Sequence, residues 1–466
     1  MNINPANTTF IVLSFEGPDI YSMVGGLGSR ITHLTNTLSE MGFQIHHIFI
    51  GDPKMKGVEA REGGRLILHR WCQWISEYHP GGVYDGEEGK VYDLTQSVPP
   101  FVVHEIAKPA LSEGKVVAVL GEEWHTAETM CRISDLLYYS GLRDKTLMFW
   151  NANNTYGFER IDWRRLSFTT TITTVSKYMK QIMLEMGINS LVIPNGIPKV
   201  FTNEVKEKDV STLRGLLGDD LLILSKVARL HPDKGWKPAV LAVENLKKLG
   251  AKVVLLARGG GEAYGMKISR LPRSPNIIVK DILLREDPQK CYYHAMFKND
   301  FTPYFEALDK HGSSDILNLL FPIPHSLLQV IYKASDVVLA NSVHEPFGLV
   351  GLEAMAAGAV VFCGCSGEDY ATHMHNAIVL DTYTANEISF YVDYLRTHPE
   401  RKQAMQKAAR QTAEQWTWEE VVNRLICKLE YQAQRQGIDL PSAAGASETE
   451  DTTSSENEAN SADLTL

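Results

Sequence analysis

Short apolar runs alternate with amphipathic helical patterns along the first part of the chain. Residues 10–15 are mostly apolar and predict a buried strand, residues 29–41 have the apolar spacing of a helix, and residues 45–50 predict the next strand. Ser176 is placed to cap a further helix. Later strands are predicted at residues 116–120, 146–149, 171–175 and 191–193. Strands that alternate with helices form parallel sheets, so this part is predicted to be an α/β domain.

The same alternation restarts further along the chain. Residues 221–227 and 252–257 predict strands on either side of a helix at residues 236–249. Later strands are predicted at residues 276–279, 337–340 and 359–362. Residues 51–100 and 280–318 lack a clear period, so we interpret the first segment as a loop excursion and the second as an insertion. The pattern therefore predicts a second α/β domain.

Turn-forming residues at 194–198 and a polar stretch at 202–209 predict a linker between the two domains. A long helical pattern near the end is interpreted as a helix that returns to the first domain, and the last segment is poor in large apolar residues and predicted to be disordered. The predicted divisions are residues 1–205, 206–415, 416–436 (the returning helix) and 437–466 (the acidic tail).

Charge and cysteine content narrow the function classes. The net charge is −10, but seven acidic residues lie in the tail, which leaves 49 acidic and 46 basic residues in the body. A nearly neutral body argues against a broad nucleic-acid surface. The six cysteines show no disulfide or zinc spacing, so we interpret them as reduced packing residues of a cytoplasmic protein. No segment predicts a signal peptide or a membrane span, and peripheral membrane contact is left open.

The strongest candidate chemistry lies after the predicted strand 337–340. Glu345 precedes a predicted helix, Gly348 begins it, and Glu353 falls in its second turn. A helix N-terminus binds phosphate, and carboxylates accept hydrogen bonds from sugar hydroxyls. The alternative is a capping Glu345 and a solvated Glu353, which the intervening Pro-Phe-Gly makes less favoured.

A second candidate follows the predicted strand 221–227. Arg229 and Lys234 lie five residues apart in the loop after that strand, where open α/β sheets bind their ligands. Two cations at this spacing can clamp a diphosphate and stabilise its charge as it leaves. The alternative is a surface turn with solvated charges.

The first domain offers weaker candidates. Gly25 and Gly26 open a helix and allow close approach of a phosphate, although a tight turn without ligand is about equally supported. His125 follows a strand and suits proton transfer, with a structural histidine as the alternative. The loop after the next strand holds Asn151, Asn153 and Asn154, whose amides suit either sugar hydroxyls or loop backbone.

These motifs together resemble glycosyltransferase family 4, whose relatives include glycogen and sucrose synthases. The resemblance rests on Arg229, Lys234 and the nine residues from Glu345 to Glu353, and extends to the first-domain Gly-Gly-Leu-Gly at residues 25–28. It implies a GT-B fold, which consists of two Rossmann-like domains facing each other across a cleft. It also implies transfer with retention at the anomeric carbon, without a metal or other cofactor.

The resemblance assigns roles to individual residues. Arg229 and Lys234 would hold the donor diphosphate, Glu345 the transferred sugar and Glu353 the ribose. Backbone at Phe347, Gly348 and Leu349 would face the sugar and phosphates, while Gly25 and Gly26 would close over the donor. Arg229, Lys234, Glu345 and His125 are the catalytic candidates, and the three asparagines are the acceptor-side candidates.

Three features depart from glycogen synthases, because Glu123 replaces an Asp, Asn153 replaces a His, and Met23-Val24 replaces Lys-Thr before the glycines. The expected reaction is hexosyl transfer from a nucleoside-diphosphate sugar, with UDP- or ADP-glucose favoured, to a hydroxyl acceptor such as a glucan, another sugar, a lipid or a small molecule. Two alternatives stay open. One is a different GT-B enzyme, such as a nucleotide-sugar epimerase or a phosphorylase, and the other is a degenerate sugar-nucleotide-binding module.

Overall fold

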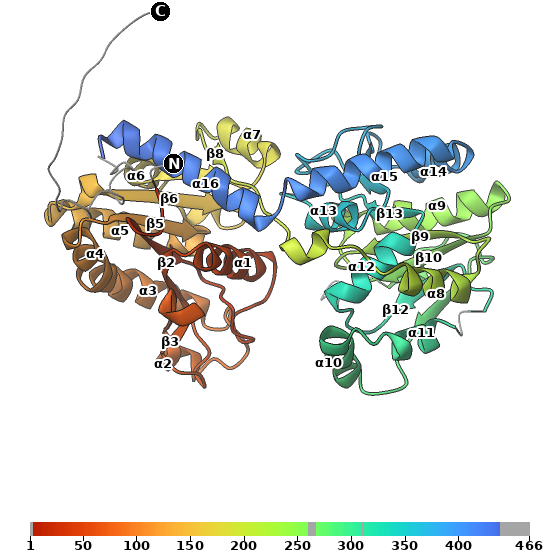
Figure 1. Ribbon diagram of the computed structural model, residues 1–466, viewed down its shortest axis with the longest axis horizontal. Helices are drawn as coiled ribbons and strands as arrows, with labels where there is room; N and C mark the ends of the chain where they lie inside the picture. The colour runs from red at the N-terminus through yellow and green to blue at the C-terminus, as the bar shows by residue number, and fades with distance from the viewer. Residues whose placement is uncertain (1–2, 260–266, 310–311, 439–466) are drawn as a thin grey trace, which may run out of the picture.

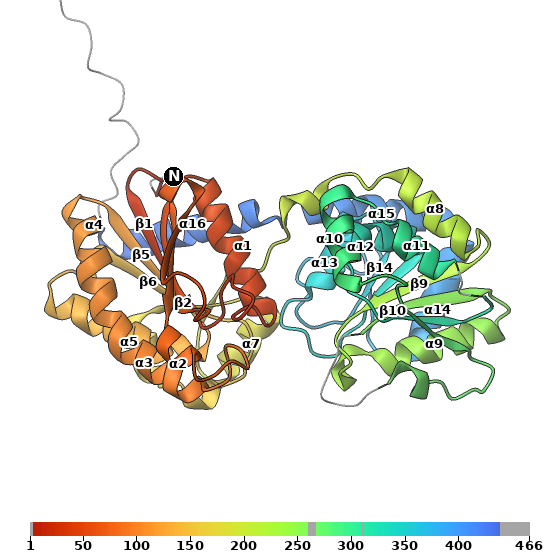
Figure 2. The same ribbon diagram turned by 90° about the horizontal axis from the view of Figure 1, so that it is seen from below.

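The computed structural model describes residues 3–259, 267–309 and 312–438. It contains two sheets in two lobes that lie side by side, with β1–β8 in one lobe and β9–β15 in the other (Figures 1 and 2). The acidic tail that we predict from residue 437 lies, from residue 439 onward, outside the described residues.

The first sheet has eight strands in the order β3-β4-β2-β1-β5-β6-β7-β8. All neighbours pair in parallel except β3, which is antiparallel to β4 at the edge. The central strand β1 is buried at all six positions, as expected for a strand with helices on both faces. The strands are β1 (Thr8–Leu13), β2 (Gln44–Ile50), β3 (Val58–Arg61), β4 (Leu66–Trp71), β5 (Val116–Glu122), β6 (Thr146–Ala152), β7 (Thr171–Thr174) and β8 (Leu191–Val192).

Helices cover both faces of this sheet. They are α1 (Gly26–Glu40), α2 (Gln73–Ser76), α3 (Glu87–Phe101), α4 (Lys108–Ser112), α5 (Trp124–Tyr139), α6 (Trp163–Thr169), α7 (Lys177–Glu185) and α16 (Trp418–Gln436). Ser176 caps α7 as the sequence predicts, since its Oγ accepts the N–H of Met179 at 3.1 Å. Helix α16 comes from the end of the chain and packs on α1, where Val421 and Leu425 share a core with Ile31 and Leu34 (Figure 1).

The second sheet has seven strands in the order β11-β12-β10-β9-β13-β14-β15, all parallel. The strands are β9 (Leu222–Val227), β10 (Val253–Arg258), β11 (Val279–Ile282), β12 (Ile316–Leu319), β13 (Val337–Ala340), β14 (Val361–Cys363) and β15 (Ile378–Val379). The helices are α8 (Glu207–Leu217), α9 (Trp236–Lys248), α10 (Pro288–Lys298), α11 (Thr302–Leu308), α12 (His325–Ala334), α13 (Leu349–Ala356), α14 (Ala385–Thr397) and α15 (Pro399–Glu414).

The interpretation of residues 51–100 and 280–318 as irregular is wrong. The first segment contains β3, β4 and most of α3, where Pro99 and Pro100 lie inside the helix and hide its period. The second contains α10 and α11, with β12 at its end. The strand expected at residues 276–279 is displaced, since β11 begins at Val279.

The cysteine interpretation is wrong for two of the six residues. Four cysteines are buried and fit packing roles, whereas Cys365 and Cys427 are exposed. Cys365 lies beyond the end of β14, so it does not share a strand face with Cys363. Its Sγ lies 2.7 Å from the hydroxyl oxygen of Tyr383.

Each sheet reverses its strand order at one point, between β1 and β5 in the first domain and between β9 and β13 in the second. Loops at the carboxyl ends of such strands form ligand sites in open α/β folds. Two contacts join these loop edges across the domains: the Lys177 N–H donates to Asp369 at 2.8 Å, and the Tyr178 hydroxyl lies 3.2 Å from His344 Nδ1. The predicted architecture of two α/β domains with facing ligand edges is confirmed.

Candidate functional site

Two loops of the second domain meet at its switch point and bring Lys234 and Glu345 together. The Lys234 Nζ lies 2.7 Å from Glu345 Oε2, and both side chains are largely enclosed. The Val343 N–H donates to the Asp233 carbonyl at 2.8 Å and joins the two loops. Gly235 has a φ of 66°, and a Cβ there would collide with Asn341, so only glycine fits this junction. Residues 111 positions apart in the chain thus form one charged site.

The helix after this loop, α13, has Gly348 at its N-cap, with a φ of 75°. Gly348 has no side-chain oxygen to accept from the first N–H groups of α13, so this helix end suits an external anion. The Phe347 ring is buried between Tyr370 and Trp416, at centroid distances of 5.9 and 5.8 Å. Phe347 therefore fixes the loop through its side chain, which leaves only its backbone for a ligand. Leu349 is the first residue of α13.

Glu353 lies in the second turn of α13, as the sequence predicts. Desolvation of the Glu353 carboxyl by the surrounding protein raises its pKa to about 7. A carboxyl with this pKa is present in both protonation states near neutral pH, so it can accept or donate a hydrogen bond to a ligand hydroxyl.

A third carboxyl, Glu368, adjoins this helix end and was missed by sequence reasoning. The residue is buried, and within the described part of the chain neither of its carboxyl oxygens has a hydrogen bond of normal geometry, although backbone groups of Glu368 and Ser366 are close enough to oppose part of the rise in its pKa. Burial raises the pKa of Glu368 to about 8, and the negative charge of Glu345 contributes to the shift. A Cβ on Gly348 would lie 2.7 Å from Glu368 Cγ, so the two residues are in direct contact. The residue stands in an irregular loop without motif spacing, which is why no sequence signal found it.

A fully buried lysine forms hydrogen bonds with β13 and with the loop that follows it. Lys226 is in β9, and its Nζ donates to Asn341 Oδ1 at 2.6 Å and to the Leu339 carbonyl at 3.2 Å. Burial, with a smaller contribution from the positive charge of nearby Lys234, lowers the pKa of Lys226 to about 7. The sequence does contain a signal for this residue, which is a lysine inside an otherwise apolar strand, but our sequence analysis did not identify it as a candidate.

Arg229 lies on the same loop as Lys234 and has an exposed side chain. Its backbone carbonyl accepts the Trp236 Nε1–H at 2.8 Å, which ties the loop to the start of α9. The structure therefore places Arg229, Lys234, Glu345, Gly348 and Glu353 in loops and a helix at one end of the second sheet.

The glycine loop of the first domain is occupied by a carboxylate of the chain itself. Glu16 Oε2 accepts the N–H groups of Val24, Gly25 and Gly28 at 3.1, 3.0 and 3.0 Å. The Gly25 N–H thus already has an anionic acceptor, and the closing of Gly25 and Gly26 over the donor stays a prediction. Gly26 is the first residue of α1.

His125 is enclosed rather than open. It is 4% exposed, and its ring stacks on Phe15 and Trp124 at centroid distances of 4.1 and 4.0 Å. Its Nε2 lies 2.9 Å from Glu87 Oε1, and Nδ1 is buried with no partner among the described residues. Burial lowers the pKa of His125 although Glu87 opposes the shift. The surroundings suit a structural or positioning histidine.

Two of the acceptor-side asparagines are engaged within the protein. Glu122 Oε2 accepts the Nδ2–H groups of Asn151 and Asn153 at 2.9 and 2.7 Å. The other oxygen of Glu122 pairs with the buried Arg30 at 3.2 Å. This network engages one amide N–H of each asparagine that we expected to serve a sugar.

The third asparagine and the residue after Glu122 stabilise the same loop. Asn154 Oδ1 accepts the Tyr156 N–H at 2.7 Å, which is the backbone-bonding alternative. Glu123 has a φ of 64°, and its Oε1 accepts the Asn153 N–H at 2.7 Å. Burial raises the pKa of Glu123 to about 8.

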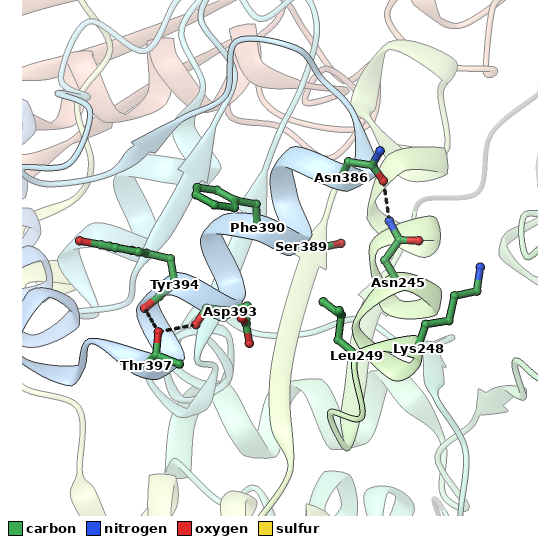
Figure 3. Close-up of a pocket in the computed structure, with 9 residues that line it drawn as sticks. All are labelled: Asn245, Lys248, Leu249, Asn386, Ser389, Phe390, Asp393, Tyr394 and Thr397. Atoms are coloured by element: carbon green, nitrogen blue, oxygen red, sulfur yellow. Dashed lines mark hydrogen bonds between the residues drawn. The ribbon is translucent and has the colours of Figure 1, made fainter.

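A surface pocket of about 560 Å³ lies away from these loops, between α9 and α14 (Figure 3). Asn245 and Lys248 line it at the end of α9 opposite to Trp236, which is roughly 18 Å along the helix at 1.5 Å per residue. The described residues contain no cluster of three or more His, Cys, Asp or Glu side chains that could hold a metal ion. No helix within the described ranges is long and apolar enough to cross a membrane.

Residues 298–412 match the family model Glycosyl transferases group 1. The D-inositol 3-phosphate glycosyltransferase of Stackebrandtia nassauensis is 22% identical over 325 residues, which cover 67% of this chain and 65% of that relative. Two other relatives of the same name match over 25% and 27% of their own length.

Two solved structures share the whole architecture. The catalytic domain of starch synthase IV from Arabidopsis thaliana, bound to ADP and acarbose, has a TM-score of 0.60 and 16% identity, with 92% of this chain and 99% of that chain covered. Anabaena HepE in complex with UDP-glucose has a TM-score of 0.54 and 13% identity, with 91% and 99% covered. The fold is thus that of the two-domain GT-B proteins. The matched residues 298–412 include the stretch from Glu345 to Glu353 that carries much of the resemblance to glycosyltransferases.

Proposed function

We propose that the protein transfers a hexosyl group from a nucleoside-diphosphate sugar to a hydroxyl acceptor, with retention of configuration. The observation that carries the proposal is the Lys234–Glu345 pair, which lies beside the α13 N-terminus and is followed in that helix by Glu353. A nucleoside-diphosphate sugar has a complementary set of groups, with two phosphates between a sugar and a ribose. The structural relatives bound to UDP-glucose and ADP support this class of donor.

Under this proposal the charged groups bind different parts of the donor. Arg229, Lys234 and the first N–H groups of α13 bind the diphosphate. Lys234 turns from Glu345 toward a phosphate, and the freed Glu345 carboxylate accepts hydroxyl hydrogens of the transferred sugar. Glu353 binds the ribose. These groups supply positive charge without a metal ion, so we propose metal-independent transfer.

The transfer step is a front-face displacement in this proposal. The bond between the anomeric carbon and the phosphate oxygen breaks, and the nucleoside diphosphate leaves with the electron pair. The acceptor oxygen bonds to the same face of the anomeric carbon, and its proton passes to the leaving phosphate oxygen. Arg229 and Lys234 act by stabilising the charge that grows on this phosphate, an effect typically worth about 10² to 10³ in rate for each group.

The test combines donor binding with turnover. UDP-, ADP- and GDP-glucose are screened for thermal stabilisation of the wild type, Arg229→Ala, Lys234→Ala and Glu353→Ala. Lys248→Ala is the matched control, because Lys248 lies at the opposite end of α9. One donor should stabilise the wild type and the control, and the site variants should lose this effect.

Acceptors are then added, including glucose, a glucan and D-inositol 3-phosphate, which the relatives' names suggest. We expect nucleoside diphosphate to be released only with one of these acceptors present. Normal turnover in Lys234→Ala would refute the assignment of the diphosphate site. Donor conversion without any acceptor would indicate an epimerase or hydrolase, and binding without conversion would indicate a degenerate module.

A further inference from the structure

The loop after β14 is joined to the loop that carries Glu345. It comprises residues 364–370 and begins directly after the last residue of β14. The Glu345 N–H donates to Ser366 Oγ at 3.0 Å. A Cβ on Gly367 would lie 2.2 Å from the Glu345 carbonyl oxygen, so the two backbones are in contact there. These contacts fix the position of the next residue, Glu368, relative to the charged site.

Glu368 lies against the N-cap of α13. A Cβ on Gly348 would be 2.7 Å from Glu368 Cγ and 3.0 Å from its Oε1. The Tyr370 hydroxyl donates to the Gly348 carbonyl, which fixes this N-cap. Glu368 is 6% exposed, yet neither of its carboxyl oxygens has a hydrogen bond of normal geometry among the described residues. A carboxylate that capped the helix would accept its first N–H groups, so Glu368 has a different role.

The charges around Glu368 favour its neutral form. Burial, followed by the negative charge of Glu345, raises the pKa of Glu368 to about 8. Backbone groups at residues 366 and 368 and the charge of Lys234 oppose only part of this rise. The other titratable side chains that act on Glu368 stay neutral because burial raises their pKa values, and they are Cys363, Tyr370 and Tyr383. At neutral pH the Glu368 carboxyl therefore has one O–H donor and one carbonyl acceptor.

A buried neutral carboxyl without hydrogen bonds suits a ligand group that both accepts and donates. Sugar hydroxyls do both, whereas an ionised phosphate only accepts. A contact that satisfies a buried polar group removes the penalty of leaving it unsatisfied, so it contributes to affinity. In the proposed function Glu345 accepts hydroxyl hydrogens of the transferred sugar, and Glu368 adjoins both Glu345 and the α13 N-cap. The sugar is thus the part of the donor that lies within reach of Glu368.

We propose that Glu368 is a specificity-determining residue that binds hydroxyl groups of the transferred sugar beside Glu345. Its O–H donates to one sugar oxygen, and its carbonyl oxygen accepts from a neighbouring hydroxyl. The two carboxyl groups then recognise the sugar differently, since ionised Glu345 only accepts while Glu368 donates and accepts. This inference rests on the proposed function and deepens it, because it predicts that the transferred hexose has free neighbouring hydroxyls at this position.

The experiment compares Glu368→Ala and Glu368→Gln with Glu306→Ala, a control at an exposed position of the same domain. The donor is UDP-, ADP- or GDP-glucose, whichever the thermal screen selects, together with analogues that each lack one hydroxyl of the glucose. The Kd of each sugar donor and of the nucleoside diphosphate without sugar is measured by calorimetry. The kcat and KM of transfer are measured for the same set of proteins.

Glu368→Ala should raise the Kd of the glucose donor about tenfold or more, because hydrogen bonds to a buried group are lost. The Kd of the nucleoside diphosphate should stay within about threefold of wild type, since it lacks the sugar. In the wild type, removal of the hydroxyl that contacts Glu368 should also weaken binding about tenfold. In Glu368→Ala the same analogue should lose less than about threefold, because the partner of that hydroxyl is already absent. Glu306→Ala should match wild type.

The pH dependence distinguishes the neutral carboxyl from its ionised form. The folded protein holds the Glu368 proton below about pH 8, so donor affinity is complete there and falls as pH rises through this value. At pH 9 the wild type should bind the glucose donor about tenfold more weakly than at pH 7. The amide of Glu368→Gln donates and accepts at every pH. This variant should bind the donor about threefold more weakly than wild type at pH 7 and change less between pH 7 and 9.

Other outcomes decide against the inference. Equal weakening of the nucleoside diphosphate and the glucose donor in Glu368→Ala would show that Glu368 acts on the diphosphate. Analogue losses as large in Glu368→Ala as in wild type would show that no sugar hydroxyl contacts it. If the wild type transfers glucose and Glu368→Ala matches it, the inference fails while the proposed function stands. If the wild type binds none of the glucose donors, the proposed function fails and the inference fails with it. If Glu368→Ala does not fold, Glu368→Gln carries the hydroxyl and pH comparisons, and an unaltered pH dependence in that variant contradicts the inference.

Discussion

Replacing Glu368 with Gln should change the pH dependence of stability. The buried carboxyl has no hydrogen-bond partner among the described residues and adjoins Glu345, and its pKa is raised from 4.5 to about 8. Between these two values the folded protein holds a proton that the unfolded chain releases. The carboxyl therefore costs nothing below pH 4.5, and its cost grows as pH rises and is complete above pH 8. Gln has nearly the same shape and does not titrate.

The size of the effect follows from the pKa shift. At 1.36 kcal/mol per pKa unit, the cost of Glu368 increases by about 4 kcal/mol between pH 5 and pH 8.5. Glu368→Gln should therefore gain about this much unfolding free energy over wild type across the range. Since the second domain has some 200 residues, its melting temperature should gain roughly 10 °C relative to wild type.

Thermal unfolding of wild type and Glu368→Gln is followed by circular dichroism at pH 5, 7 and 8.5, without nucleotide. Glu306→Gln serves as the control, because Glu306 is exposed in the same domain. The difference between Glu368→Gln and wild type should widen steadily with pH, while the control should stay parallel to wild type. A constant difference from pH 5 to 8.5 would show that Glu368 ionises normally and that its burial has no electrostatic cost.

Three further predictions address the loops and the chemistry. Ser176→Ala should cost the first domain about 1 kcal/mol of unfolding free energy, because the cap on the Met179 N–H is lost. Ser211→Ala, at an exposed position within α8, is the comparison. Gly235→Ala should destabilise the second domain by about 2 kcal/mol or more, because a Cβ at φ 66° collides with Asn341. The collision should also separate the loops that hold Lys234 and weaken donor binding. Donor binding equal to that of the wild type would contradict this. Treatment with EDTA should leave turnover within about twofold of the untreated enzyme, because protein cations supply the charge in the proposed step; restoration of a lost activity by Mg²⁺ would disprove it.

The parts of the fold that were predictable are those with a single strong period. β1 is apolar on both faces and lies at the centre of its sheet, and the pattern of residues 29–41 gives most of α1. The edge of the first sheet was missed because β3 has only four residues, and its two apolar positions, Val58 and Ala60, are the exposed ones. Helix α3 was missed because Pro99 and Pro100 usually end helices, whereas here the chain continues through a π-helical turn at Val102–Ala107.

The site residues that could be predicted are those whose relative positions follow from their spacing along the sequence. Glu345 and Glu353 are linked by one loop and one helix, and Arg229 and Lys234 share one loop, so local sequence places each pair. Glu368 and Lys226 were not predictable, because their importance comes from burial next to these loops. Spacing along the chain gives no information on how deeply an isolated charged residue will be buried.

The two domains differ in how the carboxyl groups at their ligand edges are paired. In the first domain the carboxylates at the carboxyl edge already have partners: Glu16 has backbone N–H groups, Glu122 has Arg30 and two amides, and Glu87 has His125. In the second domain Lys234 pairs with Glu345 alone, and Glu368 has no partner within the described residues. A folded protein keeps a buried polar group without hydrogen bonds only at a cost, so the second domain is where binding of a polar ligand can recover free energy. This asymmetry supports the proposal that the second domain supplies the charged groups that bind the donor diphosphate.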